Sequence, residues 1–165
     1  MAVLYDESSL EKLRDWFIAH EVTLSVAESV TSGHLQAALS SAENAMQFYQ
    51  GGITAYNGGQ KTRHLRVEPI HALGKDCVSR QVAEQMAVGS NHLFISDYAV
   101  AITGYASPQP KEGITSLFAF VAVAKGQKVI HAKRITSAKK NPSDAQVDYT
   151  NQVLRMLVES LKMDE

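Results

Sequence analysis

The stretch SVAESVTSGHLQAAL, residues Ser25–Leu39, changes its pattern abruptly. It begins inside a short apolar run, Thr23–Ala27, of the kind that forms a buried strand. From Glu28 to Gly33 the residues are polar or small, and apolar residues then recur at helical spacing up to Leu39. A strand, a tight turn and a helix make up the repeating unit of α/β proteins. The stretch therefore predicts an α/β fold and places Ser29 in the turn.

Similar changes of pattern continue along the chain. Helices are expected at residues 8–20, 31–41, 60–65, 79–94 and 141–163, and strands at 23–27, 53–56, 98–103, 116–124 and 128–135. The last two strands are joined by Gly126-Gln127, which predicts an antiparallel pair. We expect a three-layer α/β/α sandwich with a mixed, mostly parallel sheet, formed by residues 1–165 as a single domain.

Composition narrows the class of protein. The chain has 165 residues, of which 45% are hydrophobic and 20% charged, as in ordinary globular proteins. The formal net charge of −1 gives no reason to expect nucleic acid or an anionic membrane as a partner. One cysteine excludes an internal disulfide, and the segment Met1–Glu7 lacks the features of a signal peptide. The cytoplasm is the expected location, with no membrane partner.

Ser29 has two interpretations. Its hydroxyl would cap a backbone N–H at the start of the following helix. Alternatively, it is a nucleophile at the mouth of a site, where backbone N–H groups stabilise negative charge. Sites in α/β sheets lie at the carboxyl ends of strands, so Ser29, Tyr56 and Gly104 are expected at one edge.

A serine nucleophile needs a base. No G-x-S-x-G motif is present, and His34 fits a surface position in the next helix. Lys61 follows Tyr56 by five residues, and a desolvated lysine acts as a base. The ordinary interpretation of this pair, a half-buried aromatic residue and a solvated lysine, stays open.

Nothing in the sequence indicates a metal or a cofactor. The six histidines have no metal-ligand spacing, and Cys77 stands alone. Neither glycine pair, Gly51-Gly52 or Gly58-Gly59, matches a phosphate or dinucleotide motif.

Four segments in chain order resemble the motifs of one family. VAESVTSG (26–33) is similar to A-E-S-C-T-G-G, and FYQGGITAYNGGQKTRHLRV (48–67) is similar to F-x-x-G-x-x-x-Y-S-N-E-x-K-x-x-x-L-G-V. CVSRQVAEQMAVG (77–89) is similar to A-V-S-x-x-V-x-x-x-M-A-x-G, and DYAVAITGYASP (97–108) to D-x-A-V-x-x-T-G-I-A-G-P. By these motifs and their spacings the chain resembles the CinA C-terminal domain family, the nicotinamide mononucleotide deamidases.

The resemblance implies a three-layer α/β/α fold and hydrolysis of the carboxamide of nicotinamide mononucleotide, or of a related amide, to the acid and ammonia. It implies Ser29 as nucleophile, with Lys61 and Tyr56 handling the proton. The resemblance also implies that the substrate is bound by Glu28, Thr31, Ser32, Gly33, Gly104, Tyr105, Ala106 and Ser107. The implied partner is a small nucleotide, no cofactor or metal is needed, and self-association into a homo-oligomer is expected.

The chain also departs from the family pattern. Gly58-Gly59 replaces Asn-Glu, and the loop after Pro108 is several residues shorter. The late G-D-R motif is missing, and Ser137–Asn141 stands in its place, with Lys139 or Lys140 as candidate positive charges. These departures support a second hypothesis, in which the chain is a catalytically impaired paralogue that binds a nucleotide or a protein.

Overall fold

The chain folds around one five-stranded mixed sheet. The computed structural model describes residues 4–164, and Met1–Val3 and Glu165 lie outside the described residues. The expectation that no signal peptide is present therefore falls partly on residues outside the described range. The strands are β1 (Leu24–Glu28), β2 (Tyr49–Thr54), β3 (Tyr98–Gly104), β4 (Leu117–Lys125) and β5 (Lys128–Ser137). Their order is β2-β1-β3-β4-β5. The β1 strand pairs in parallel with both neighbours, and β4 runs antiparallel to β3 and β5, so four strands share one direction.

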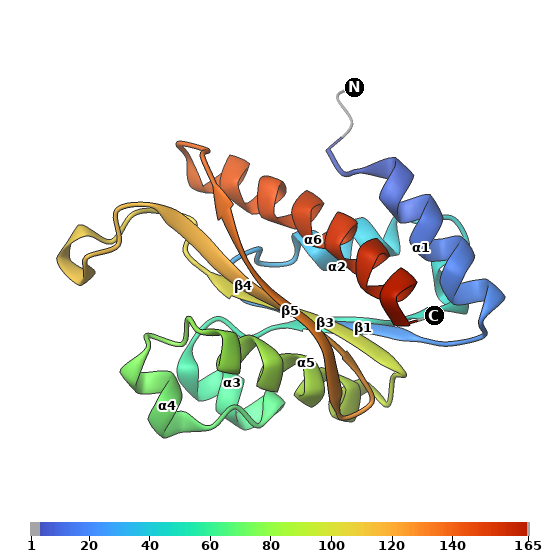
Figure 1. The fold of residues 1–165 in the computed structure, drawn as a ribbon, viewed down its shortest axis with the longest axis horizontal. Helices are drawn as coiled ribbons and strands as arrows, with labels where there is room; N and C mark the ends of the chain where they lie inside the picture. Colours follow the sequence, from blue (N-terminus) through green and yellow to red (C-terminus); the bar gives the residue numbers. More distant parts are fainter. Residues whose placement is uncertain (1–3, 165) are drawn as a thin grey trace.

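Helices cover both faces of this sheet. They are α1 (Glu7–Ala19), α2 (His34–Ser40), α3 (Gly58–Leu65), α4 (Pro69–Gly74), α5 (Arg80–Phe94) and α6 (Pro142–Asp164), with short 3₁₀ turns at Ala45–Gln47 and Pro110–Glu112. Figure 1 shows α1, α2 and α6 on one face and α3, α4 and α5 on the other. The predicted three-layer α/β/α sandwich with a mixed, mostly parallel sheet is therefore confirmed. No helix within residues 4–164 is long and apolar enough to cross a bilayer.

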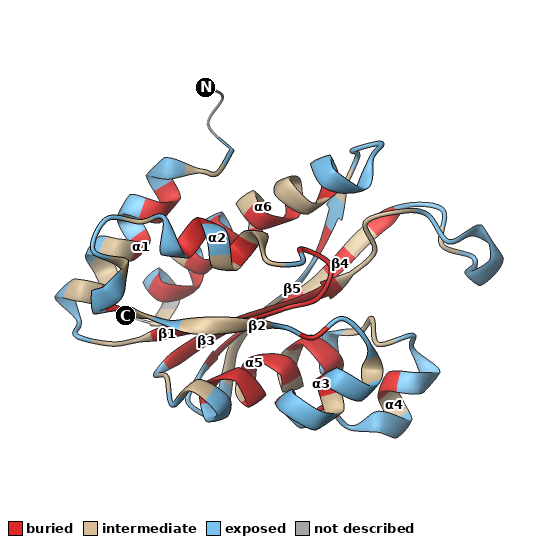
Figure 2. Cartoon of the chain, turned by 180° about the vertical axis from the view of Figure 1, so that it is seen from behind, coloured by how far each residue is buried: buried red, intermediate tan, exposed pale blue. Residues whose placement is uncertain are grey.

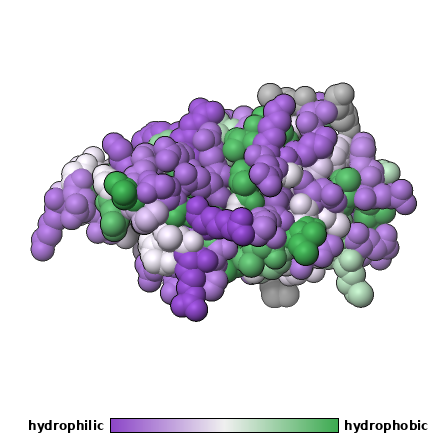
Figure 3. Space-filling view, turned by 90° about the horizontal axis from the view of Figure 1, so that it is seen from below, coloured by the Kyte–Doolittle hydropathy of each residue, from purple (hydrophilic) through white to green (hydrophobic). Residues whose placement is uncertain are grey.

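Two cores lie against the two faces because side chains alternate along each strand. On β3, Val100 and Ile102 belong to the core beneath α1, α2 and α6. Ala101 of the same strand belongs to the core beneath α3, α4 and α5, which is rich in alanine. The central strands β1, β3 and β4 are largely buried between the helical layers, whereas the edge strands β2 and β5 are only partly buried. The outer helical surfaces are exposed (Figure 2). Seen from the side of α3–α5, polar side chains cover most of the surface and the apolar patches are separate (Figure 3).

Close packing between two helices explains why residue 89 of α5 is a glycine. A Cβ at Gly89 would overlap the carbonyl oxygen of Leu65 at the end of α3. The helix backbone of α5 therefore passes directly against α3, and only the absence of a side chain permits this approach.

Some local expectations are corrected. The first helix is capped by Asp6, whose side chain accepts from the Ser9 amide, so it begins before Ser8. The strand expected at 53–56 spans Tyr49–Thr54 and includes Gly51-Gly52. Residue 52 is glycine because a side chain there would collide with Gln36. Helix α4 was not expected, although Glu68-Pro69 is a cap followed by proline at the first helical position.

Candidate active site

A buried serine and a buried lysine meet at the carboxyl edge of the sheet. Ser29 directly follows β1, and its side chain is buried in the turn. Lys61, on α3, is only 1% exposed. Its Nζ donates to Ser29 Oγ at 3.0 Å and to the Tyr56 carbonyl oxygen at 3.2 Å. The ordinary interpretation of Lys61 as a solvated side chain is therefore wrong.

Burial changes the proton affinity of this lysine. It lowers the pKa of Lys61 from its ordinary value of 10.5, because the charged ammonium loses its hydration. Cys77 and Asp76 act in the opposite direction and raise the pKa, but their effect is smaller. A lysine with a lowered pKa has a larger neutral fraction, and a neutral amine beside Ser29 Oγ is able to accept its proton.

The serine and lysine open into a cavity of about 600 Å³. The loops after β1, β2 and β3 meet there, as expected from the topology. Of the residues singled out in the sequence, the lining includes Ser29, Tyr56, Lys61, Gly104, Tyr105, Ala106 and Ser107. The Tyr56 side chain is exposed at the rim, and its backbone carbonyl, not its phenol, contacts Lys61.

The loop after β3 is held in place by close packing and by two hydrogen bonds. A Cβ at Gly104 would overlap Ala119 of β4, so glycine is required where the loop leaves the sheet. The Tyr149 hydroxyl donates to the Tyr105 carbonyl oxygen at 2.8 Å, and the Tyr105 hydroxyl donates to Asp76 Oδ2 at 3.2 Å. Burial, followed by the charge of Asp76, raises the pKa of Tyr105 to about 12. Tyr105 therefore stays a neutral hydrogen-bond donor.

The other expected binding residues lie at the end of β1 and in the turn that leads to α2. Glu28 is fully buried, and its carboxylate accepts from Thr31 Oγ1 at 2.6 Å, from the Leu35 amide at 2.8 Å, and from the Gln36 amide and side chain. None of Glu28, Thr31, Ser32 and Gly33 is among the residues that line the cavity.

Ser29 does not cap α2. The residue at that position is Gly33, with φ of +102°, and it makes no side-chain cap bond. The carboxylate of Glu28 instead receives the first helical amides, Leu35 and Gln36. The capping interpretation of Ser29 is therefore wrong, and its hydroxyl remains available to Lys61.

The sequence analysis missed several lining residues, among them Asp76, Cys77, Gln109, Pro142 and Gln146. Asp76 and Cys77 both have a left-handed backbone, with φ of +51° and +58°, which turns the chain into the cavity. Their place just before the Ser79 helix cap was the only local signal. Pro142 and Gln146 come from the start of α6, more than 100 residues beyond Ser29, and no local pattern connects them to it.

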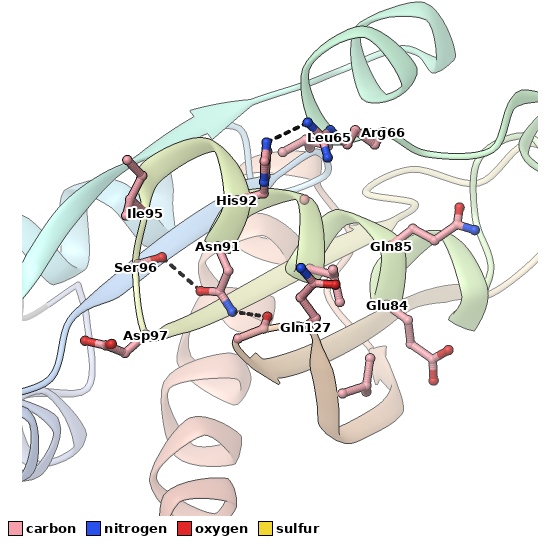
Figure 4. A pocket seen from close by; sticks show the side chains of 14 residues that line it. Leu65, Arg66, Glu84, Gln85, Asn91, His92, Ile95, Ser96, Asp97 and Gln127 are labelled. Atoms are coloured by element: carbon pink, nitrogen blue, oxygen red, sulfur yellow. Dashed lines mark hydrogen bonds between the residues drawn. The ribbon is translucent and has the colours of Figure 1, made fainter.

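A second cavity, of about 770 Å³, lies at the opposite edge of the sheet. Figure 4 shows its side chains around the end of α5 and the β4–β5 turn. Its polar groups bind one another: Asn91 donates to the Ala124 and Gly126 carbonyl oxygens, and Arg66 donates to His92 Nε2 at 2.6 Å. This cavity contains no serine–lysine pair like that at Ser29. Within residues 4–164, no three His, Cys, Asp or Glu side chains are grouped to hold a metal ion.

The comparisons with known proteins agree with the motifs. A CinA-like protein of Mycolicibacterium vanbaalenii is 34% identical over 142 residues, which cover 84% of this chain and 33% of that protein. A CinA-like protein of a Picosynechococcus strain is 38% identical over 95 residues, covering 58% of this chain and 23% of that protein. The chain thus spans only a quarter to a third of the length of these relatives.

Solved structures and a family profile extend the likeness to nearly the whole chain. The competence damage-inducible protein A of Klebsiella pneumoniae superposes with a TM-score of 0.88 at 25% identity, covering 94% of this chain and 96% of that one. A CinA superfamily protein of Enterobacter cloacae gives a TM-score of 0.87 at 28% identity, covering 98% of each chain. Residues 6–161 match the profile of the CinA C-terminal domain. On its motifs, its fold and this match, the chain belongs to the CinA C-terminal domain family.

Proposed function

We propose that the chain is a serine amidohydrolase, which converts the carboxamide of a nicotinamide nucleotide or a related amide to the acid and ammonia. The observation that carries the proposal is the 3.0 Å hydrogen bond between Lys61 Nζ and Ser29 Oγ at the cavity wall. Both side chains are almost completely buried in the wall of this cavity. The reaction class follows the family resemblance of the sequence.

The chemistry needs only the groups of the chain and one water molecule. Neutral Lys61 accepts the proton of Ser29 as Oγ attacks the carboxamide carbon. The tetrahedral intermediate collapses when ammonia leaves with the proton that Lys61 returns, and an ester on Ser29 remains. A water molecule, deprotonated by Lys61, then hydrolyses the ester to the acid and regenerates Ser29.

The Tyr56 carbonyl oxygen orients the lysine for both proton transfers, because it accepts from the same Nζ. This assigns Tyr56 a positioning role through its backbone. The family resemblance also implies that backbone amides around Thr31–Gly33 hold the oxyanion or the phosphate. The Ser32 amide already donates to the Ser29 carbonyl oxygen at 3.1 Å, which leaves it out of that role.

Ammonia release from the purified protein tests the proposal. The protein is incubated with nicotinamide mononucleotide and, separately, with its phosphate-free nucleoside, nicotinamide riboside. We expect release from at least one of them, and Ser29→Ala to lower it by about a thousandfold or more. Ser40→Ala, which removes an exposed hydroxyl of α2, is the matched control and should keep full activity.

Two outcomes would overturn the proposal. One is release that persists in folded Ser29→Ala protein. The other is a folded native protein that releases no ammonia from either amide, which would favour the catalytically impaired binding module. The proposal also includes a cytoplasmic location, a requirement for no cofactor, and self-association into a homo-oligomer.

A further inference from the structure

Helix α6 contributes two residues to the wall of the cavity, and neither was expected from the sequence. Lys139 and Lys140, the cations considered there, are exposed and do not line the cavity. Pro142 and Gln146, in the first turns of α6, line it instead. A glutamine carries no charge, but its amide nitrogen donates hydrogen bonds, so the partner of that nitrogen indicates what Gln146 does.

The side chain of Gln146 holds the turn that contains Ser29. Its Nε2 donates to the Val30 carbonyl oxygen at 3.0 Å, although the two residues are 116 positions apart in the chain. Tyr149, one turn further along α6, donates from its hydroxyl to the Tyr105 carbonyl oxygen at 2.8 Å. Helix α6 therefore fastens both the turn after β1 and the loop after β3, which form two sides of the cavity.

Val30 directly follows the candidate nucleophile, and its backbone is held on both sides. The peptide group before it is fixed because the Ser32 amide donates to the Ser29 carbonyl oxygen at 3.1 Å. The peptide group after it is fixed because Gln146 donates to the Val30 carbonyl oxygen. Peptide groups are planar, so these two hydrogen bonds together set the direction of the Val30 amide. The Val30 side chain is buried in the core beneath α1, α2 and α6.

The Val30 amide is available for a substrate. The Ser29 amide already donates to the Ile102 carbonyl oxygen at 3.1 Å, whereas the Val30 amide has no hydrogen-bond partner among residues 4–164. Val30 also lines the cavity. In hydrolases whose serine stands in a turn between a strand and a helix, the amide of the next residue stabilises the oxyanion. Such a donor is effective when its direction is fixed before the charge develops.

We infer that Gln146 is a positioning residue for hydrolysis at Ser29: it holds Val30 so that the Val30 amide donates to the oxyanion of the tetrahedral intermediate. The inference rests on the proposed function and adds one residue to its machinery. Gln146 acts through Val30 and does not touch the reacting atoms. Its loss therefore weakens the stabilisation of the intermediate more than the binding of the intact amide.

Gln146→Met tests this role, because methionine keeps the length of the side chain and removes the N–H donor. Gln152→Met is the matched control. Gln152 also lies on α6, and its Nε2 donates to the Thr136 carbonyl oxygen at 2.9 Å, away from the cavity. The values of kcat and KM are measured by ammonia release from nicotinamide mononucleotide or, where only the riboside is hydrolysed, from the riboside. Stability is measured by urea denaturation.

We expect Gln146→Met to lower kcat by about ten- to hundredfold, with KM within about twofold of the native value. Gln152→Met should keep the native kcat, although both variants lose one hydrogen bond of α6 and similar amounts of stability. The midpoint of the pH profile of kcat/KM should not move in Gln146→Met, because Lys61 makes no hydrogen bond to Gln146 in the part of the chain that the structure describes.

Three outcomes would overturn the inference and leave the proposed function standing. One is a native kcat in Gln146→Met, and another is an equal loss of kcat in Gln146→Met and Gln152→Met, which would reduce the effect to the stability of α6. The third is a raised KM with an unchanged kcat, which would make Gln146 a residue that binds the substrate. Absence of ammonia release from the native protein would instead overturn the proposed function.

Discussion

Lys61 is the residue whose chemistry depends most on its surroundings. A lysine on a short exposed helix would titrate near 10.5, but burial against Ser29 lowers the pKa of Lys61. Cys77 and then Asp76 act in the opposite direction and partly restore it. In the proposed mechanism, the balance between burial and these two neighbours sets the pH at which Lys61 becomes neutral.

The pH profile of kcat/KM should therefore rise with a midpoint below 10.5, since activity needs neutral Lys61. In Asp76→Asn the midpoint should move to lower pH, because the variant removes an anion that raises the pKa of Lys61. The profile of ammonia release measures both values. A midpoint that moves upward in Asp76→Asn would contradict this electrostatic account.

Glu28 is another buried ionisable residue near the site, and its role is structural. Replacing Glu28 by alanine leaves the Leu35 amide and the Thr31 hydroxyl buried without an acceptor. We expect a loss of about 3 kcal/mol or more in the free energy of unfolding, measured by urea denaturation. Glu28→Gln keeps one carbonyl oxygen and should lose less. Equal stability of Glu28→Ala and the native protein would show that α2 does not depend on this carboxylate.

At the scale of elements, the contact between α3 and α5 decides where Lys61 lies. Gly89→Ala should lower the free energy of unfolding by about 1–3 kcal/mol, because the new methyl group overlaps the Leu65 carbonyl oxygen. Alanine otherwise favours a helix over glycine by about 1 kcal/mol. Gly74→Ala, at the end of α4, meets no atom within 4 Å and is the matched control. A Gly89→Ala protein as stable as the native one would contradict this packing.

Helical and strand elements were largely predictable because each has its own periodicity or cap. Ser79 caps α5 and accepts from the Val82 amide, and β4 pairs antiparallel with β5, both as predicted. The start of β2 was misplaced because Gly52 accommodates Gln36, a contact between distant segments. Local patterns carry no information of that kind.

The candidate site was predictable only in part for the same reason. The topology brought Ser29, Tyr56 and Gly104 to one edge. The residues themselves offered Lys61 only as one possible base, and its role beside Ser29 was implied by the family resemblance. Spacing cannot reveal that Lys61 is buried, and it did not reveal that the Tyr56 backbone is the contacting group. Asp76 was missed because nothing in a short loop marks the direction of its side chain.

At the scale of the whole molecule, three carboxylates cap helices or connect elements near the surface. Asp6 caps α1 and pairs with Arg155 of α6, Glu68 caps α4, and Asp164 accepts from Tyr98 and Lys125. Their pKa values are lowered, first by the Ser9 amide for Asp6, by the His71 amide for Glu68 and by the Tyr98 hydroxyl for Asp164. Each carboxylate is therefore more acidic in the folded chain than in the unfolded chain.

The stability that these groups confer is present above their ordinary pKa values of 3.8 to 4.5, and it is lost as the pH falls through the lower folded values. The free energy of unfolding should thus decrease with acidification below about pH 5. The triple variant Asp6→Asn, Glu68→Gln and Asp164→Asn should show a shallower decrease. Urea denaturation at a series of pH values from 7 to 3 measures this decrease in the free energy of unfolding. An equal decrease in the native protein and in the triple variant would contradict the role of the three carboxylates.

The sheet order also determines when catalysis would appear during refolding. The β4–β5 hairpin closes through a turn at Gly126-Gln127 and is local, so it forms early. The pairing of β1 with β3 joins segments such as Thr23 and Asp97, which are 74 residues apart, and distant closures are slow. Ser29 stands at the end of β1, so the serine–lysine pair assembles only after this late step. Amide-exchange protection in the hairpin should precede recovery of enzymatic turnover.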